Sequence, residues 1–210
     1  MNLDIFGYLA LFTVVITSLG ILISQSWRWS LVLLALQYLG VFILVALSWP
    51  FLLVLAKLIA GWMTVLVLWI AYASLSMPQG PTNQQPDSAD TSFERMQLSV
   101  RVFRLFAAAI LGLVFVSVAP IIKQWFPSVT VTQIIGSLVL IGIGLLQLGL
   151  TSDPFRVTLG LLTILMGFEI LYAGMEISAL VQGLLAGVTL GLGLIGAYLI
   201  LSPTMGETLE

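Results

Sequence analysis

The sequence predicts an all-α, polytopic membrane protein with about seven transmembrane helices arranged as a 3+1+3 parallel repeat. Three observations lead to this fold class: an extreme apolar composition, polar breaks between long apolar stretches, and a similarity between the two halves of the chain. Of the 210 residues, 60% are hydrophobic and 8% are charged. A soluble domain of this length cannot bury so much apolar surface, so the chain is expected to be integral to a lipid bilayer.

Each spanning helix needs about 20 apolar residues, because a helix rises about 1.5 Å per residue and the hydrocarbon core is about 30 Å thick. The first span is expected to be uncleaved, since the N-terminus lacks the basic region of a signal peptide. Pro50 divides the next apolar stretch, because the residue before a proline disfavours helical geometry. The expected spans are 4–24, 30–48, 51–76, 101–121, 130–151, 155–175 and 178–202.

The spans group into four segments. Residues 1–76 are expected to form an N-terminal three-helix repeat and residues 126–210 a C-terminal one, with a connecting transmembrane helix at 101–125. Residues 77–100 contain the long polar run "MPQGPTNQQPDSADTSFERMQ". Its Pro, Gln, Ser and Asp content predicts a flexible polar loop on the cytoplasmic side.

The placement of basic residues predicts the orientation, because Lys and Arg concentrate in short cytoplasmic loops. One side of the expected topology has five arginines near span ends, and the other has only Lys123. This bias puts the N-terminus outside and the C-terminus inside an inner (cytoplasmic) membrane, with Arg28 and Arg156 as cytoplasmic anchors. The five arginines are Arg28, Arg95, Arg101, Arg104 and Arg156.

The two halves of the chain align when the sequence is shifted by 128 positions, which places "RWSLVLLALQYLGVFIL" on "RVTLGLLTILMGFEILY". Arg28 then falls on Arg156 and Ser30 on Thr158. A chance match between leucine-rich helices is the alternative. Because four spans separate the starts of the two groups, the first three and last three helices are expected to run in the same direction.

Two charged side chains, Lys57 and Glu169, lie inside predicted spans, each roughly 9 Å from the outer end at 1.5 Å per residue. Opposite charges at one depth would lower each other's desolvation cost. Three interpretations stay open: a proton-relay carboxylate, a fixed ion pair or helix–helix hydrogen bond, and a snorkelling lysine without a mechanistic role. Glu176 falls in a short turn, where solvation is expected, although its seven-residue spacing from Glu169 also suits an exit path.

Polar and small residues within the spans are expected mainly to join helices. Gln37 is the most interesting, because it lies on the helix equivalent to the one that carries Glu169, and it is a candidate for polar support inside the membrane. The four-residue spacing of Gly183, Gly187 and Gly191 predicts close helix packing. The other polar residues expected to bond across helix interfaces are Thr64, Gln133, Gln147, Thr163, Gln182 and Thr189.

The sequence contains no cysteine and no histidine. Disulfides, thiolate and imidazole metal ligands, Fe–S ligation and histidine-bound haem are thereby excluded. Intramembrane proton chemistry would have to use carboxylates and lysine. No metal site and no cofactor are expected, and 7 basic against 9 acidic residues leave no footprint for nucleic acid.

The stretch 156–199, with Gly167-Phe168-Glu169 inside it, resembles a known family. Over residues 131–201 the chain is similar to the small K-type (chain 4L) subunit of NADH:quinone oxidoreductase, complex I, which has three helices, an Arg before the second and a Gly-x-Glu within it. The C subunit of multisubunit sodium/proton antiporters shares this pattern. The whole chain resembles, more faintly, component E of hydrogenase-4. The residues that carry this second likeness are Trp27, Arg28, Gln37 and Lys57.

The resemblance implies a membrane-arm subunit of a redox-driven ion pump, placed among antiporter-like and other hydrophobic subunits and holding no redox cofactor. Such a subunit is an accessory part of an oxidoreductase complex and has no catalytic residues of its own. Whether this chain belongs to an enzyme is therefore left open. Glu169 corresponds to the family's Gly-x-Glu carboxylate, which belongs to a hydrophilic axis. A second carboxylate, usual in the third helix, is missing here, with Gly187 nearest to its position. The alternatives are a purely structural subunit of such a complex or of a cation/proton antiporter, and a stand-alone small transporter.

Overall fold

The computed structural model describes residues 2–24, 26–75, 91–175 and 178–207, without the side chains of 2–4, 91–99 and 203–207. Within these residues the chain is all helix and turn, and no strand occurs. The helices are α1 (Asn2–Ile23), α2 (Trp27–Ala46), α3 (Phe51–Leu75), α4 (Thr91–Trp125), α5 (Val131–Gly149), α6 (Pro154–Ala173) and α7 (Ala179–Glu207).

Each of these 7 helices is long and apolar enough to cross a membrane. The predicted class, an all-α polytopic membrane protein, is therefore confirmed over the part of the chain that the structure describes. Large apolar side chains cover much of the outer surface, as expected where lipid replaces water as the solvent.

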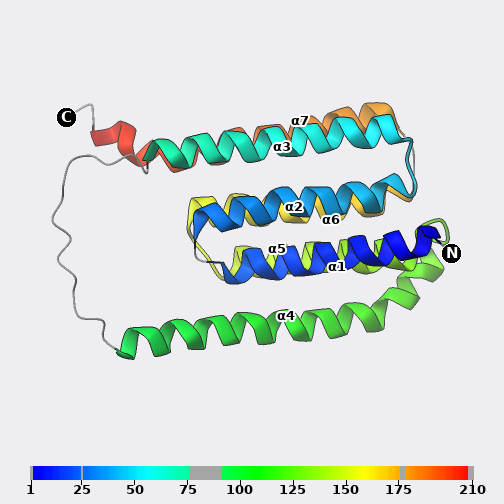
Figure 1. Cartoon of the computed structure of the whole chain (residues 1–210), viewed down its shortest axis with the longest axis horizontal. Helices are drawn as coiled ribbons and strands as arrows, with labels where there is room; N and C mark the ends of the chain where they lie inside the picture. Colours follow the sequence, from blue (N-terminus) through cyan, green and yellow to red (C-terminus); the bar gives the residue numbers. More distant parts are fainter. Residues whose placement is uncertain (1, 25, 76–90, 176–177, 208–210) are drawn as a thin grey trace.

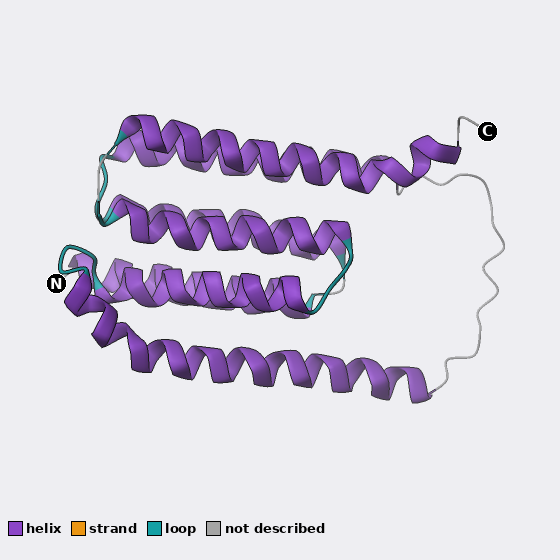
Figure 2. Ribbon diagram, turned by 180° about the vertical axis from the view of Figure 1, so that it is seen from behind, coloured by secondary structure: helices purple, strands orange, loops and turns teal. Residues whose placement is uncertain are grey.

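The helices form two rows of three, with α4 beside them (Figures 1 and 2). One row consists of α1, α2 and α3, and the other of α5, α6 and α7; α1 contacts α5, α2 contacts α6, and α3 contacts α7. The helices of each such pair run in the same direction (Figure 1). Phe51 and Ala179, the first residues of α3 and α7, are 128 positions apart. The arrangement in space thus follows the shift that aligns the two halves of the sequence.

The arginines gather at one end of the bundle. Arg28 is the second residue of α2 and Arg156 the third of α6, while Arg104 lies in the first half of α4. These three helices begin at the same end (Figure 1), which we call the arginine end. Lys123 lies near the opposite end of α4. The charge bias behind the predicted orientation is therefore present in three dimensions, and the orientation itself stays a prediction.

Short polar motifs set where the helices of the second row begin. Thr130 precedes α5 and accepts a hydrogen bond from the Gln133 backbone N–H at 3.4 Å, while the Gln133 side chain accepts one from the Thr130 N–H at 3.0 Å. This reciprocal pair is a capping box. Asp153 caps α6 by accepting from the Phe155 N–H at 3.4 Å. Pro154 occupies the first helical position, where a backbone N–H would have no helical partner.

Helix α4 begins earlier than the sequence predicts. The expected polar loop ran to residue 100, but α4 begins at Thr91 and is 35 residues long. Residues 91–98 contain no Gly or Pro and several good helix formers, so the membrane helix continues through them. Residues 76–90 of that loop lie outside the described residues. Near its other end α4 contains Pro120 and bends (Figure 1), as expected where a proline removes a helical hydrogen bond.

Glycines let α5 and α6 approach each other closely. A Cβ added to Gly167 would lie 2.7 Å from the carbonyl oxygen of Ser137, and one added to Gly144 would lie 2.9 Å from the carbonyl oxygen of Gly160. Both distances are shorter than a real Cβ contact. The two backbones therefore touch, and the glycine of the Gly-x-Glu motif is a packing residue.

Helix α7 packs through glycines other than the predicted ones. A Cβ on Gly193 would collide with Thr64 of α3, and one on Gly196 would collide with Thr158 of α6. The prediction from four-residue spacing fails within the described chain, because that spacing selects a face of α7 that points away from α3 and α6. No other atom lies within 4 Å of the place a Cβ would take at Gly183, Gly187 and Gly191.

Candidate functional site

Lys57 of α3 and Glu169 of α6 form an ion pair inside the bundle. Lys57 is the seventh residue of α3, and Glu169 lies four residues before the end of α6. Their side chains are only 6% and 2% exposed. The two charges, which the sequence predicts at equal depth, are thus in direct contact, and the lysine side chain does not extend out of the bundle.

The pair links the two rows of helices. Helix α3 belongs to the first row and packs on α2 and α7, whereas α6 belongs to the second and packs on α5 and α7. The long lysine side chain spans the distance between these two helices. The Lys57–Glu169 ion pair thus joins the two rows of helices in the interior of the bundle.

Among the described residues, neither charge has a hydrogen bond to a group outside the pair. The structure gives Lys57 Nζ and both carboxylate oxygens of Glu169 no hydrogen bond to any other group among the described residues. An ammonium has three donors and a carboxylate several lone pairs, so most of this capacity is unused. Buried ion pairs offset their desolvation cost only when additional hydrogen bonds complete them. This pair is therefore poorly satisfied as a structural link.

Tyr38 lies close to the site and was not singled out from the sequence. Its ring packs directly on Gly61, where a Cβ would collide with it. Gly61 is one helical turn from Lys57 and on the same face of α3. The Tyr38 hydroxyl is buried and has no hydrogen-bond partner among the described residues. Its position next to Gln37 is the only sign of it in the sequence, because a tyrosine within an apolar run is usually a packing residue.

Gln37 does not contact the ion pair by any hydrogen bond that the structure gives. Its Nε2 donates to Ser18 Oγ of α1 at 2.9 Å, and its Oε1 is buried without a partner. Gln37 thus joins α1 to α2. This bond between helices is of the kind expected for polar residues within the spans; a wider role of Gln37 as polar support inside the membrane stays a prediction.

Three other polar side chains also join helices, as the sequence predicts. Gln133 Nε2 donates to the Leu44 carbonyl oxygen and to Ser48 Oγ, both at 2.8 Å. Gln147 Nε2 donates to the Arg156 carbonyl oxygen at 2.9 Å. Thr64 Oγ1 donates to its own helix at 3.0 Å and approaches the Thr189 carbonyl oxygen of α7 at 3.4 Å. By contrast, Thr163 Oγ1 donates to the Leu159 carbonyl oxygen of its own helix at 2.8 Å.

The remaining site candidates lie away from the pair. The Arg28 guanidinium lies over the Trp27 ring at 5.3 Å from its centroid, a cation–π distance. Arg156 Nη2 donates to the Ser24 carbonyl oxygen at 3.1 Å. Both arginines lie at the arginine end, and their role as cytoplasmic anchors stays a prediction. Glu176, the candidate for an exit path, lies outside the described residues.

No protein-family model, curated protein or solved structure matches the chain. The features of the chain that point to a function are accordingly the buried ion pair and the sequence motif around Glu169.

Proposed function

We propose that the chain is a non-catalytic membrane-arm subunit of a complex I-like or membrane-bound hydrogenase-like, redox-driven ion pump, in which Glu169 and Lys57 take part in moving protons or sodium ions. The observation that carries this proposal is the buried Lys57–Glu169 pair. Ionisable groups inside a membrane domain are costly, and they are typical of ion pathways.

The incomplete hydrogen bonding of the pair favours a dynamic role over a static one. A proton that passes from the Lys57 ammonium to the Glu169 carboxylate leaves a neutral amine and a neutral acid. That exchange removes two charges from a low-dielectric interior, and no other hydrogen bond of the described residues holds either group in its charged form. A carboxylate that changes partner in this way is able to accept or release a proton within the membrane.

The position of Glu169 supports the same proposal. Gly167, two residues earlier, touches the α5 backbone at Ser137, so the segment that carries the carboxylate is held in place by helix packing. The Gly-x-Glu pattern of the resembled family therefore joins a packing glycine to a charged group. A rigid helix is suited to a group that must keep its depth in the bilayer while its partner changes.

A structural role is the second candidate, and one observation favours it. The ion pair joins α3 of one row to α6 of the other, so it would also serve to hold the two three-helix units together. A stand-alone small transporter is the third candidate. Its ion site would then lie between the two repeats.

The test replaces Glu169 by glutamine in the native membrane complex and measures ion translocation per assembled complex and per electron pair transferred. We expect coupled translocation to be largely lost in the complexes that assemble, because an amide keeps the shape but cannot carry the proton. Asp153→Asn is the matched control. It makes the same change on the same helix, at a carboxylate that is 51% exposed, and asparagine caps a helix as well as aspartate does.

Three results are informative. Normal coupling with correctly assembled Glu169→Gln would overturn the ion-translocation role. Reduced assembly with normal coupling in the complexes that remain would favour the structural role. Ion transport by the purified chain alone in vesicles would favour the stand-alone transporter, whereas a subunit is expected to co-purify with hydrophobic partners.

A further inference from the structure

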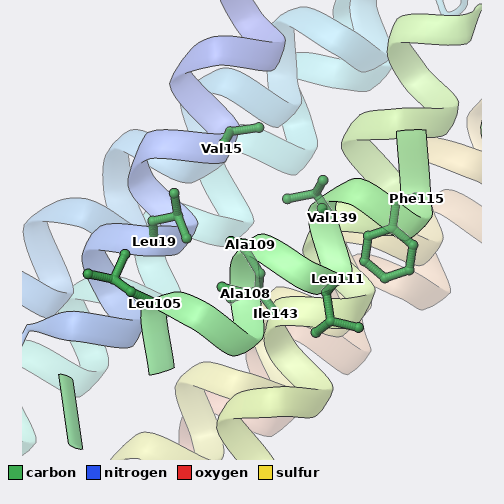
Figure 3. A pocket seen from close by; sticks show the side chains of 10 residues that line it. Val15, Leu19, Leu105, Ala108, Ala109, Leu111, Phe115, Val139 and Ile143 are labelled. Carbon is green, nitrogen blue, oxygen red and sulfur yellow. The ribbon is translucent and has the colours of Figure 1, made fainter. Parts of the chain in front are cut away.

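An apolar groove lies between α4 and the two rows, on the side formed by α1 and α5 (Figure 3). Its volume is about 220 Å³, and the side chains drawn there are all hydrocarbon. We call it the α4 groove. The helices that line it contribute Val15 and Leu19 of α1, Leu105 and Phe115 of α4, and Val139 and Ile143 of α5.

The groove has the length of one lipid leaflet. Its lining on α4 runs from Leu105 to Phe115, which is about 15 Å at 1.5 Å per residue. Half of the hydrocarbon thickness of a bilayer is also about 15 Å. Gly112 lies within this stretch, and a Cβ there would meet no other atom within 4 Å. The groove therefore has free space beside Gly112, about two thirds of the way along this stretch.

A polar cavity of about 10 Å³, the room of one water molecule, adjoins the groove at the arginine end. Each lining helix continues into it: α1 at Leu22, α4 at Arg104 and α5 at Gln147. Leu22 is three residues beyond Leu19, and Arg104 directly precedes Leu105. Arg156 of α6 lines the same cavity. Two guanidinium groups thus lie where the apolar groove ends.

The described side chains give the cavity an excess of positive charge and one unused donor. Arg104 Nε is buried and has no hydrogen-bond partner among the described residues. Arg104 Nη1 donates to the Leu22 carbonyl oxygen at 3.2 Å. Among the described side chains, the only carboxylate at this end is Asp153, half-exposed and 3.8 Å from Arg156 Nε. An anion between the two arginines would relieve their mutual repulsion.

We propose that the α4 groove and the two arginines at the mouth of this cavity form a binding site for one anionic phospholipid. Its phosphate would bind Arg104 and Arg156, and one acyl chain would lie along the groove between α4 and the rows. Arginine suits a phosphate because its planar guanidinium donates two parallel hydrogen bonds. Basic pockets between membrane helices are typical sites for acidic headgroups. The inference does not depend on the proposed ion translocation.

The experiment measures lipid retention. The full chain is purified, delipidated in detergent and titrated separately with phosphatidylglycerol and with phosphatidylcholine, and bound lipid is counted by mass spectrometry of the intact complex. We expect one phosphatidylglycerol to bind on the order of 30-fold more tightly than phosphatidylcholine, since each basic side chain contributes about fivefold. Arg104→Gln should remove most of this preference. Lys123→Gln, at the opposite end, should leave it unchanged.

A second pair of variants tests the groove. Gly112→Leu places a side chain where a Cβ meets no other atom within 4 Å and should weaken the binding of both lipids. Gly187→Leu makes the same change on the outer face of α7, where a Cβ also meets no atom within 4 Å, and should have no effect. Circular dichroism confirms that each variant is folded.

Four outcomes would overturn the inference. The first is equal retention of the two lipids by the unaltered chain. The second is an unchanged preference in Arg104→Gln. The third is equal weakening by both leucine variants, which is the behaviour of annular lipid only. The fourth is displacement of phosphatidylglycerol by millimolar inorganic phosphate, which would mean that the cavity takes free phosphate and the acyl chain adds nothing.

Discussion

Removal of one member of the Lys57–Glu169 pair should destabilise the protein far more than removal of both. The two side chains are 6% and 2% exposed, and no other described group bonds to either charge. Lys57→Met leaves a buried carboxylate without a counter-charge, a change that typically costs about 3–5 kcal/mol. The double variant K57M/E169L removes both charges together with their desolvation cost. Such replacements are often neutral or stabilising, by about 1–4 kcal/mol.

Thermal unfolding in detergent, followed by tryptophan fluorescence, measures these changes. At about 2–4 °C per kcal/mol for a chain of this size, each single variant should lower the midpoint by on the order of 10 °C. The double variant should unfold within a few degrees of the unaltered protein or above it. The cycle then gives a coupling free energy of about 6 kcal/mol or more, above the roughly 0.5–3 kcal/mol that is usual for residues in contact. Asp153→Asn serves as the control for a carboxylate near water.

Two results would refute the reasoning. If Lys57→Met and Glu169→Leu each leave the midpoint unchanged, the charges are not desolvated in the way their burial indicates. If the decreases in the unfolding midpoint of the two single variants simply add in the double variant, the coupling free energy is zero. The contact between the two charges then does not stabilise the protein.

Three further predictions concern helix packing, and thermal unfolding measures each of them. Gly167→Ala should lower stability by about 1–3 kcal/mol, because its Cβ would be forced onto the backbone of α5; an unchanged midpoint would mean that α6 shifts freely. Gly187→Ala should raise stability by about 0.5–1 kcal/mol, since nothing crowds this site and alanine favours helix, and a loss there would reveal a contact outside this chain. Gln133→Leu should cost about 1–3 kcal/mol, because the Leu44 carbonyl oxygen and Ser48 Oγ lose their donor; a neutral result would show that other groups replace it.

Much of the fold follows from the sequence because the bilayer restricts the choices. A chain that must satisfy its backbone hydrogen bonds within each apolar segment has to form helices of a fixed minimum length. Span number and the parallel direction of the two halves follow from that restriction together with the turn at Pro50 and the similarity between the halves. The common depth of Lys57 and Glu169 follows as well, because depth depends only on the helical rise and the positions of the helix ends.

The side-chain contacts between neighbouring helices do not follow from the sequence in this way. Which residues meet depends on the rotation of each helix about its own axis, and uniformly apolar helices give little periodic signal for it. This explains why Gly187 and its neighbours were predicted to pack, whereas Gly193 and Gly196 do so. It also explains why Gln37 points to Ser18 and not to the charged pair. The early start of α4 was missed because polar composition was taken as a sign of loop, although Gly and Pro are absent from its first turns.

The parallel pairing of the two rows has a consequence for how such a chain can be divided. A unit of three helices starts on one side of the membrane and finishes on the other, so a second copy fused directly to it would be inserted upside down. Helix α4, which runs opposite to α1 and α5 (Figure 1), returns the chain to the starting side. Two separate polypeptides would each insert in the correct sense without it. Residues 1–75 and 131–210 made as independent chains should therefore reassemble in one orientation.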